Sequence, residues 1–188
     1  MGEIFHCGTQ NIDTKRLILR RFLITDADDM YANVCSDSRV NRYLTWKVHN
    51  SIDDTIELMK SFVARYESDS RYCWAIVEKE TNQVIGTIAA PTVKEKTKTI
   101  EITYAIGFDW WGKGITAEAV NAVIDFFFEK VGINRIEAGH DRLNVNSGKV
   151  MQKVGMQKEG VLRQAGINNT GVFDIVLYSI LKEEWEAN

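Results

Sequence analysis

The sequence predicts one α+β domain, in which helices pack on both faces of a mixed, mostly antiparallel sheet of about seven strands. Three observations predict it. The 188 residues suit a single domain, and 45% of them are hydrophobic, which is enough for a sizeable core. Only one proline is present, and no low-complexity segment or charge block marks a linker. Helical and strand patterns follow one another along the chain. We therefore expect a single domain over residues 1–188, with its core at about residues 13–185.

The first third of the chain predicts one strand and two helices. "KRLILRRF" (15–22) mixes apolar and basic residues as a strand near a sheet edge does. A helix is predicted from Thr25, the N-cap candidate, because acidic residues follow in its first turn. The next helix begins after Ser51, which has capping-box spacing to Asp54. Its apolar residues recur at helical period: Ile56, Met59, Phe62, Val63 and Tyr66.

Residues 72–108 change to strand character. "YCWAIVEK" (72–79), "VIGTIAAP" (84–91) and "TIEITYAIGF" (99–108) are rich in β-branched and aromatic residues, and short polar segments separate them. Three successive strands joined by short connections predict an antiparallel meander.

The last third alternates again. Residues 115–130 have helical periodicity, and "INRIEAGH" (133–140) returns to strand character. "NSGKVMQKVG" (146–155) predicts a short helix. The strands "VLRQAGI" (161–167) and "VFDIVLYSIL" (172–181) flank the turn-like "NNTG", which indicates a hairpin.

Charge and composition exclude several classes of function. The net charge of −3 comes from 23 basic and 26 acidic residues, so the protein has no general electrostatic attraction for nucleic acid or for an anionic membrane. No apolar run approaches the roughly 20 residues that span a bilayer. The first residues lack the pattern of a secretory signal, so we expect a cytoplasmic protein. Cys7, Cys35 and Cys73 lack the spacing of zinc ligands, so we expect no metal.

The segment "WWGKGITAEAVN" (110–121) predicts an anion site. Gly112 and Gly114 have no side chains, so backbone amides there can approach an anion. The following helix adds its positive N-terminus, and Lys113 adds a local cation. The spacing matches neither GxxxxGK[ST] nor GxGxxG, so the two standard nucleotide motifs are not indicated.

Four linked motifs surround this turn in one order: W-G-x-G, an E-A pair, an N-x-x-S step and a K-x-G-[FM]-x-x-E-G ending. They are formed by Trp111, Gly112, Gly114, Glu118, Ala119, Asn144, Ser147, Lys153, Gly155, Met156, Glu159 and Gly160. With these motifs, residues 104–160 resemble the GNAT superfamily of acetyl-CoA-dependent N-acetyltransferases. More narrowly, they resemble the RimJ/RimL-like branch of ribosomal-protein N-terminal acetyltransferases. The order of strands and helices agrees along nearly the whole chain.

The resemblance implies a GNAT-like fold whose fourth and fifth strands splay apart in a V that holds acetyl-CoA. It also implies that the backbone near the end of the fourth strand pairs with the pantetheine arm, at Ile106, Gly107 and Phe108. Amides of the glycine turn would hold the pyrophosphate, from Trp111 and Gly112 through Lys113, Gly114 and Ile115 to Thr116. Asn144 would contact the pantetheine region, and Ser147 would lie near the thioester sulfur.

Two departures concern the turn. The wider superfamily has Gln or Arg at the position of Trp111, although tryptophan is common there in the RimJ/RimL-like branch. It also has Gly or Ala at the position of Thr116. We interpret Trp111 as packing for the turn, whereas Trp110 borders either the cofactor or the acceptor.

The implied reaction is direct attack of a neutral primary amine on the thioester. The amine must first lose a proton, directly or through water, to a base. Glu101 is our first candidate for this base, although it is an ordinary strand charge if its side chain points to solvent. His140, Asp141 and Asp174 are the alternatives. Ser147 is a candidate acid for the departing thiolate, and it also fits a helix-capping step with Asn144.

Two glutamate positions limit what the resemblance implies. The branch can carry a proposed catalytic glutamate after a Q-A step, whereas this chain has Gly166 there. Glu118 fits a role in complementing the helix dipole.

The acceptor amine is a protein N-terminus or a small molecule such as an aminoglycoside or polyamine. A noncatalytic acyl-CoA-binding module is the alternative to an acyltransferase, and both a monomer and a homodimer remain open.

Overall fold

The computed structural model describes residues 3–187, so the predicted domain limits at residues 1 and 188 lie outside the described part. Over that part the chain forms one eight-stranded sheet with the order β1-β2-β3-β4-β5-β6-β8-β7. The strands are β1 (Ile12–Asp13), β2 (Leu17–Arg20), β3 (Tyr72–Glu78), β4 (Val84–Lys94), β5 (Thr99–Ile106), β6 (Arg135–Asp141), β7 (Gln157–Asn168) and β8 (Gly171–Leu181). The predicted mixed sheet is confirmed, and the two-residue strand β1 is the one that the sequence patterns missed.

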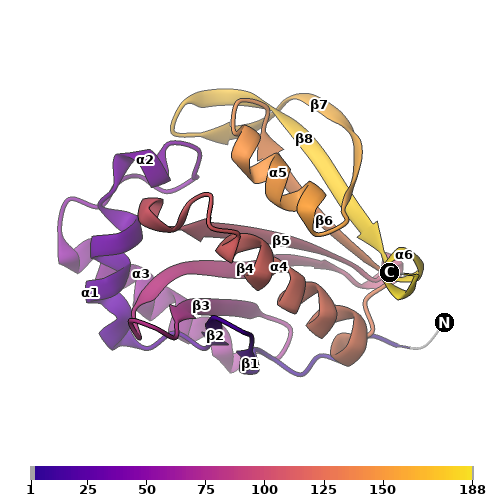
Figure 1. Ribbon diagram of the computed structural model, residues 1–188, viewed down its shortest axis with the longest axis horizontal. Coiled ribbons are helices and arrows are strands. Elements are labelled where there is room, and N and C mark those ends of the chain that lie inside the picture. The colour runs from indigo at the N-terminus through magenta and orange to yellow at the C-terminus, as the bar shows by residue number, and fades with distance from the viewer. Residues whose placement is uncertain (1–2, 188) are drawn as a thin grey trace.

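The helices lie on both faces of this sheet, as predicted (Figure 1). They are α1 (Ala27–Met30), α2 (Ser38–Asn41), α3 (Ile52–Ala64), α4 (Ile115–Phe126), α5 (Val145–Lys153) and α6 (Lys182–Glu186). A π-helical turn (Phe127–Val131) extends α4, so the helical region ends at the residue before Gly132. No helix in residues 3–187 has the length and apolar character needed to cross a bilayer.

The two predicted helix starts have different outcomes. The capping box of α3 is confirmed, because Ser51 Oγ accepts from the Asp54 N–H at 3.4 Å and Asp54 Oδ2 accepts from the Ser51 N–H at 3.3 Å. The prediction of Thr25 as an N-cap is wrong. The helical region before α1 begins at Ile24, and its cap is Leu23, two residues before Thr25. The Leu23 N–H donates to Asp26 Oδ2 at 2.8 Å.

Strand β3 is buried on both faces and therefore joins two cores. Tyr72, Trp74 and Ile76 pack with α4 in one cluster, while the alternate residues Cys73 and Ala75 pack with α1 and α3 in the other. This alternation explains why the segment reads as an almost continuous apolar run.

Strands β5 and β6 splay apart as expected. They form the parallel pair of the sheet, but the pairing runs only from Thr99 with Arg135 to Glu101 with Glu137. Beyond this point β5 stays paired with β4 as far as Ile106, and β6 stays paired with β8 as far as Asp141. The two strands therefore diverge towards α2 and the start of α4 (Figure 1).

Candidate functional site

A cavity of about 320 Å³ lies at the open end of this splay. Its walls come from α2, the end of β5, the glycine turn, the start of α4 and α5. The lining residues are Arg39, Val40, Tyr43, Leu44, Tyr104, Ala105, Ile106, Trp110, Trp111, Gly112, Gly114, Thr116, Ala117, Asn144, Asn146, Ser147, Lys149, Val150 and Lys153. Three of them are cationic and none is a carboxylate, so the cavity favours an anionic ligand.

The glycine turn forms one rim of this cavity. Gly112 and Gly114 have φ values of 74° and 75°, a region that favours glycine. Gly114 is the N-cap of α4 and makes no side-chain cap, so the first amides of the helix are available to an anion. Lys113 is exposed and outside the cavity lining, and Ile115 is buried in the core.

The two tryptophans hold the turn against the sheet. Trp111 donates its indole N–H to the Ile106 carbonyl oxygen at 2.9 Å, and Trp110 donates to Glu78 Oε1 at 2.9 Å. Both side chains also line the cavity. The Trp111 ring packs on Phe108 with ring centres 5.0 Å apart. The two tryptophans precede the glycines because their indole groups anchor the turn, Trp110 to β3 and Trp111 to the end of β5.

Some of the backbone hydrogen-bonding groups at the end of β5 already have partners within the protein. The Gly107 N–H donates to the Ile85 carbonyl oxygen at 2.8 Å, on the side of β4. The Ile106 carbonyl oxygen accepts from Trp111 at 2.9 Å, although a carbonyl oxygen keeps a second lone pair. Phe108 lies outside the lining, and its ring packs under the Arg39 guanidinium, which is 3.7 Å from the ring centre.

Asn144 and Ser147 lie together at the start of α5. Asn144 Oδ1 accepts from the Ser147 N–H at 3.5 Å, so the capping role is present. Across the splay, the Tyr104 hydroxyl donates to the Ser147 carbonyl oxygen at 3.0 Å. Burial raises the pKa of Tyr104 to about 12, so it stays a donor at neutral pH. Both predicted residues line the cavity.

Glu101 lies at the point of the V rather than in the cavity lining. It is the last β5 residue that is paired with β6, and its neighbour there is Glu137. Since Ile100 and Ile102 pack in the α4 cluster, strand alternation places Glu101 on the opposite face. Its side chain is half-buried and makes no hydrogen bond or ion pair with any described residue of 3–187.

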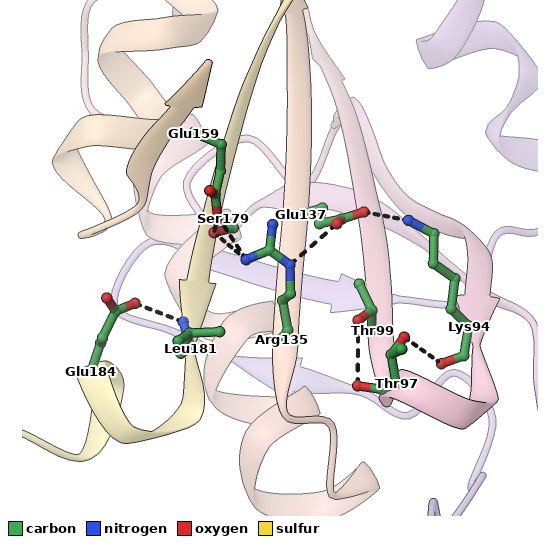
Figure 2. Close-up of polar contacts among 9 residues, drawn as sticks. All are labelled: Lys94, Thr97, Thr99, Arg135, Glu137, Glu159, Ser179, Leu181 and Glu184. Carbon is green, nitrogen blue, oxygen red and sulfur yellow. Dashed lines mark hydrogen bonds and ion pairs between the residues drawn. The ribbon is translucent and has the colours of Figure 1, made fainter.

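The same face carries a network of paired charges (Figure 2). Glu137 accepts from Lys94 at 2.7 Å and from Arg135 at 3.2 Å, and Arg135 also donates to Glu159 at 2.7 Å. The network spans β4, β6, β7 and β8. In contrast to Glu137, the neighbouring Glu101 carboxylate is thus unpaired among the described residues.

The three alternative bases lie outside the cavity lining. His140 Nδ1 donates to the Asp141 carbonyl oxygen at 2.7 Å, and the His140 ring packs against Tyr178. Asp141 is buried and accepts from the Leu143 N–H at 2.8 Å. Asp174 accepts from the Gln164 N–H at 2.9 Å and braces the β7–β8 hairpin. Each residue therefore has a structural partner, although His140 Nε2 is buried without a hydrogen-bond partner among residues 3–187.

Gly166 has a packing reason of its own. A Cβ at this position would lie 2.4 Å from the ring of Phe173. The side chain that the RimJ/RimL-like branch can carry there has no room unless Phe173 moves.

Sequence reasoning missed most of the cationic lining. Lys149 and Lys153 are one helical turn apart on α5, so they lie on one face of the helix. This spacing is visible in the sequence and could have identified the pair. Arg39 and Tyr43 come from α2 and the residues after it, which no motif marks. Tyr104 lies within the recognised strand, but only the splay gives it a role.

Comparisons with known proteins show which family the sequence matches. The family model of the acetyltransferase (GNAT) domain matches residues 16–157. The chain is 34% identical over 171 residues to the uncharacterized N-acetyltransferase YoaA of Bacillus subtilis, and the match covers 91% of this chain and 96% of the relative. It is 25% identical to the [ribosomal protein uS5]-alanine N-acetyltransferase of Escherichia coli, over 64% of this chain and 62% of that one.

A solved structure shares the fold. The microcin C7 self-immunity acetyltransferase MccE, determined in complex with acetyl-CoA and AMP, has a TM-score of 0.80 and 22% sequence identity. The similarity covers 89% of this chain and 93% of that one.

Proposed function

Since this chain belongs to the GNAT family of N-acetyltransferases, we propose that it transfers acetyl from acetyl-CoA directly to the primary amine of a protein N-terminus. The observation that carries the proposal is the cavity at the β5–β6 splay, which combines a glycine turn with Arg39, Lys149 and Lys153 and has no lining carboxylate. The relative that acetylates the alanine of ribosomal protein uS5 supports a protein acceptor over a small amine.

In this proposal the donor lies along the cavity. Amides from Gly112 to Thr116 bind the pyrophosphate, which the positive end of α4 favours. Lys149 and Lys153 face the phosphates from the opposite wall, where an ammonium group suits a phosphate oxygen. Asn144 lies beside the pantetheine arm, and Ser147 lies beside the thioester. The residues present therefore fit acetyl-CoA in charge and in the availability of donors.

The chemistry needs a neutral amine and an acid for the leaving group. The amine approaches from the face that carries Glu101, and its excess proton passes through water to this carboxylate. The nitrogen then attacks the thioester carbonyl, the new C–N bond forms, the nitrogen releases its second proton to solvent, and the C–S bond breaks. The Ser147 hydroxyl gives its proton to the departing thiolate and regains one from solvent.

A thiol-release assay with acetyl-CoA tests the acceptor and the base together. The panel holds peptides with free N-termini, the same peptides with blocked N-termini, a polyamine and an aminoglycoside. We expect turnover with free peptides alone, and a 10²- to 10⁴-fold loss in Glu101→Gln, the usual contribution of a general base. Turnover on a small amine alone would overturn the protein acceptor. Full activity of Glu101→Gln would remove Glu101 as the base.

A further inference from the structure

Hydrogen bonds behind the glycine turn join Thr14 and Arg16, which precede β2, to Glu118 in α4, 102 residues after Arg16. We call this set of contacts the bracket. The carboxylate of Glu118, in the first turn of α4, accepts from the Arg16 N–H at 2.8 Å and from Arg16 Nε at 2.7 Å. It also accepts from the Thr14 hydroxyl at 2.7 Å. Three donors on one carboxylate fix its position, which is more than a charge at a helix N-terminus requires.

The same guanidinium group reaches the turn itself. Arg16 Nη1 donates to the Lys113 carbonyl oxygen at 3.0 Å, so Arg16 bridges the Glu118 carboxylate and the turn backbone. Arg16 Nη2 lies 3.9 Å from the position that a Cβ on Gly114 would take. Arg16 therefore lies directly against the peptide between the two glycines.

This contact determines the direction of one amide. In a trans peptide the carbonyl oxygen and the following N–H point in opposite directions. Because the Lys113 carbonyl points to Arg16, the Gly114 N–H points away from Arg16, and Gly114 lines the cavity. A turn with two glycines has many backbone conformations to lose, so a fixed peptide plane lowers the entropy cost of ordering it around a ligand.

We propose that Arg16 and Glu118 are positioning residues for the acetyl donor, and that their bracket presets the Lys113–Gly114 peptide to bind the pyrophosphate. Neither side chain lines the cavity, so both act through the turn. The inference rests on the proposed placement of the pyrophosphate at this turn.

The test measures dissociation constants for acetyl-CoA by calorimetry and for S-acetylpantetheine, which has no phosphates, by NMR titration. The variants are Glu118→Gln and Arg16→Lys. Each keeps the approximate shape of its side chain and weakens the bracket. We expect acetyl-CoA to bind about tenfold more weakly, because one charge-assisted contact no longer orients the turn. The S-acetylpantetheine constant stays the same, and so does kcat at saturating acetyl-CoA.

Glu137→Gln is the matched control, because Glu137 is, like Glu118, a half-buried carboxylate in an ion pair, here with Lys94 and Arg135, but it lies away from the turn. Its two dissociation constants stay at the wild-type values. Unchanged acetyl-CoA binding in both bracket variants would overturn the proposal, and so would an equal loss for both donors. If the wild-type protein binds acetyl-CoA and S-acetylpantetheine equally well, the proposed placement of the pyrophosphate at the glycine turn is itself wrong. That result does not depend on the identity of the acceptor.

Discussion

Gly86 in β4 permits a close approach of two backbones. A Cβ on Gly86 would lie 2.4 Å from the Ala105 carbonyl oxygen and 3.1 Å from Ile106 Cα. Gly86→Ala must shift the end of β5, and we expect the free energy of unfolding to fall by about 1–3 kcal/mol. Urea denaturation measures this change.

Gly160 in β7 is the matched control for that substitution. No heavy atom beyond its chain neighbours lies within 4 Å of its Cβ position, so Gly160→Ala should stay within about 0.5 kcal/mol of the wild type. Equal effects of the two substitutions would contradict the close approach at Gly86.

Trp111 shows how far a single residue can be predicted. The W-G-x-G motif indicated that this side chain packs the turn, and its indole N–H does fasten the turn to the Ile106 carbonyl. Glu118 was predicted only to complement the helix dipole, because its partner Arg16 lies 102 residues earlier in the sequence. Local patterns reveal a role that a residue has with its neighbours, but not a contact that the tertiary fold creates.

At the scale of elements, the outcome depended on whether the sequence carries a residue type that is typical of the boundary. Ser51 and Asp54 form a standard capping pair, so the start of α3 was predictable. The start of the first helical region was not, because its cap is Leu23, which has no polar side chain, and the Leu23 N–H and the Arg20 guanidinium both donate to Asp26 at 2.8 Å. Strand β1 has only two residues, which is too short for any periodicity to appear.

The charge network on the open face of the sheet gives the stability a pH dependence. Burial raises the pKa of Glu137, but the hydrogen bonds and charges of Lys94 and Arg135 outweigh this effect and hold the pKa below its usual value. A carboxyl group with a lowered pKa in the folded state stabilises it above the unfolded value of about 4.5. This contribution disappears as the pH falls through the folded-state pKa.

We therefore expect Glu137→Gln to lower the free energy of unfolding by about 1 kcal/mol at pH 7, and the difference from the wild type to shrink below about pH 4. Urea denaturation at a series of pH values measures both quantities. Glu80→Gln, on an exposed turn, is the control and should match the wild type throughout. A difference for Glu137→Gln that stays constant from pH 7 to pH 3 would contradict the assignment.

For the whole molecule, the order of strands and helices was sufficient to predict a mixed sheet, whereas its splay was predicted from the resemblance to the GNAT superfamily. The closure of the cavity wall was not predictable, because it joins distant segments. At the tip of the β7–β8 hairpin, Asn169 donates from its side chain to the Asn41 and Trp46 carbonyl oxygens at 2.8 and 2.7 Å. Its backbone N–H donates to the Leu44 carbonyl oxygen at 3.2 Å. The hairpin thereby holds the segment that carries Tyr43 and Leu44 against the cavity.

Hydrogen exchange with and without acetyl-CoA tests most directly that the donor lies in the splay. We expect slower exchange at the glycine turn and the start of α4 (111–118) and at the start of α5 (144–150), whose side chains or backbone line the cavity. Residues 92–97, on the far side of β5, serve as the internal control and should not change. Protection at the control segment with none at the turn or at α5 would contradict a donor bound between β5 and β6.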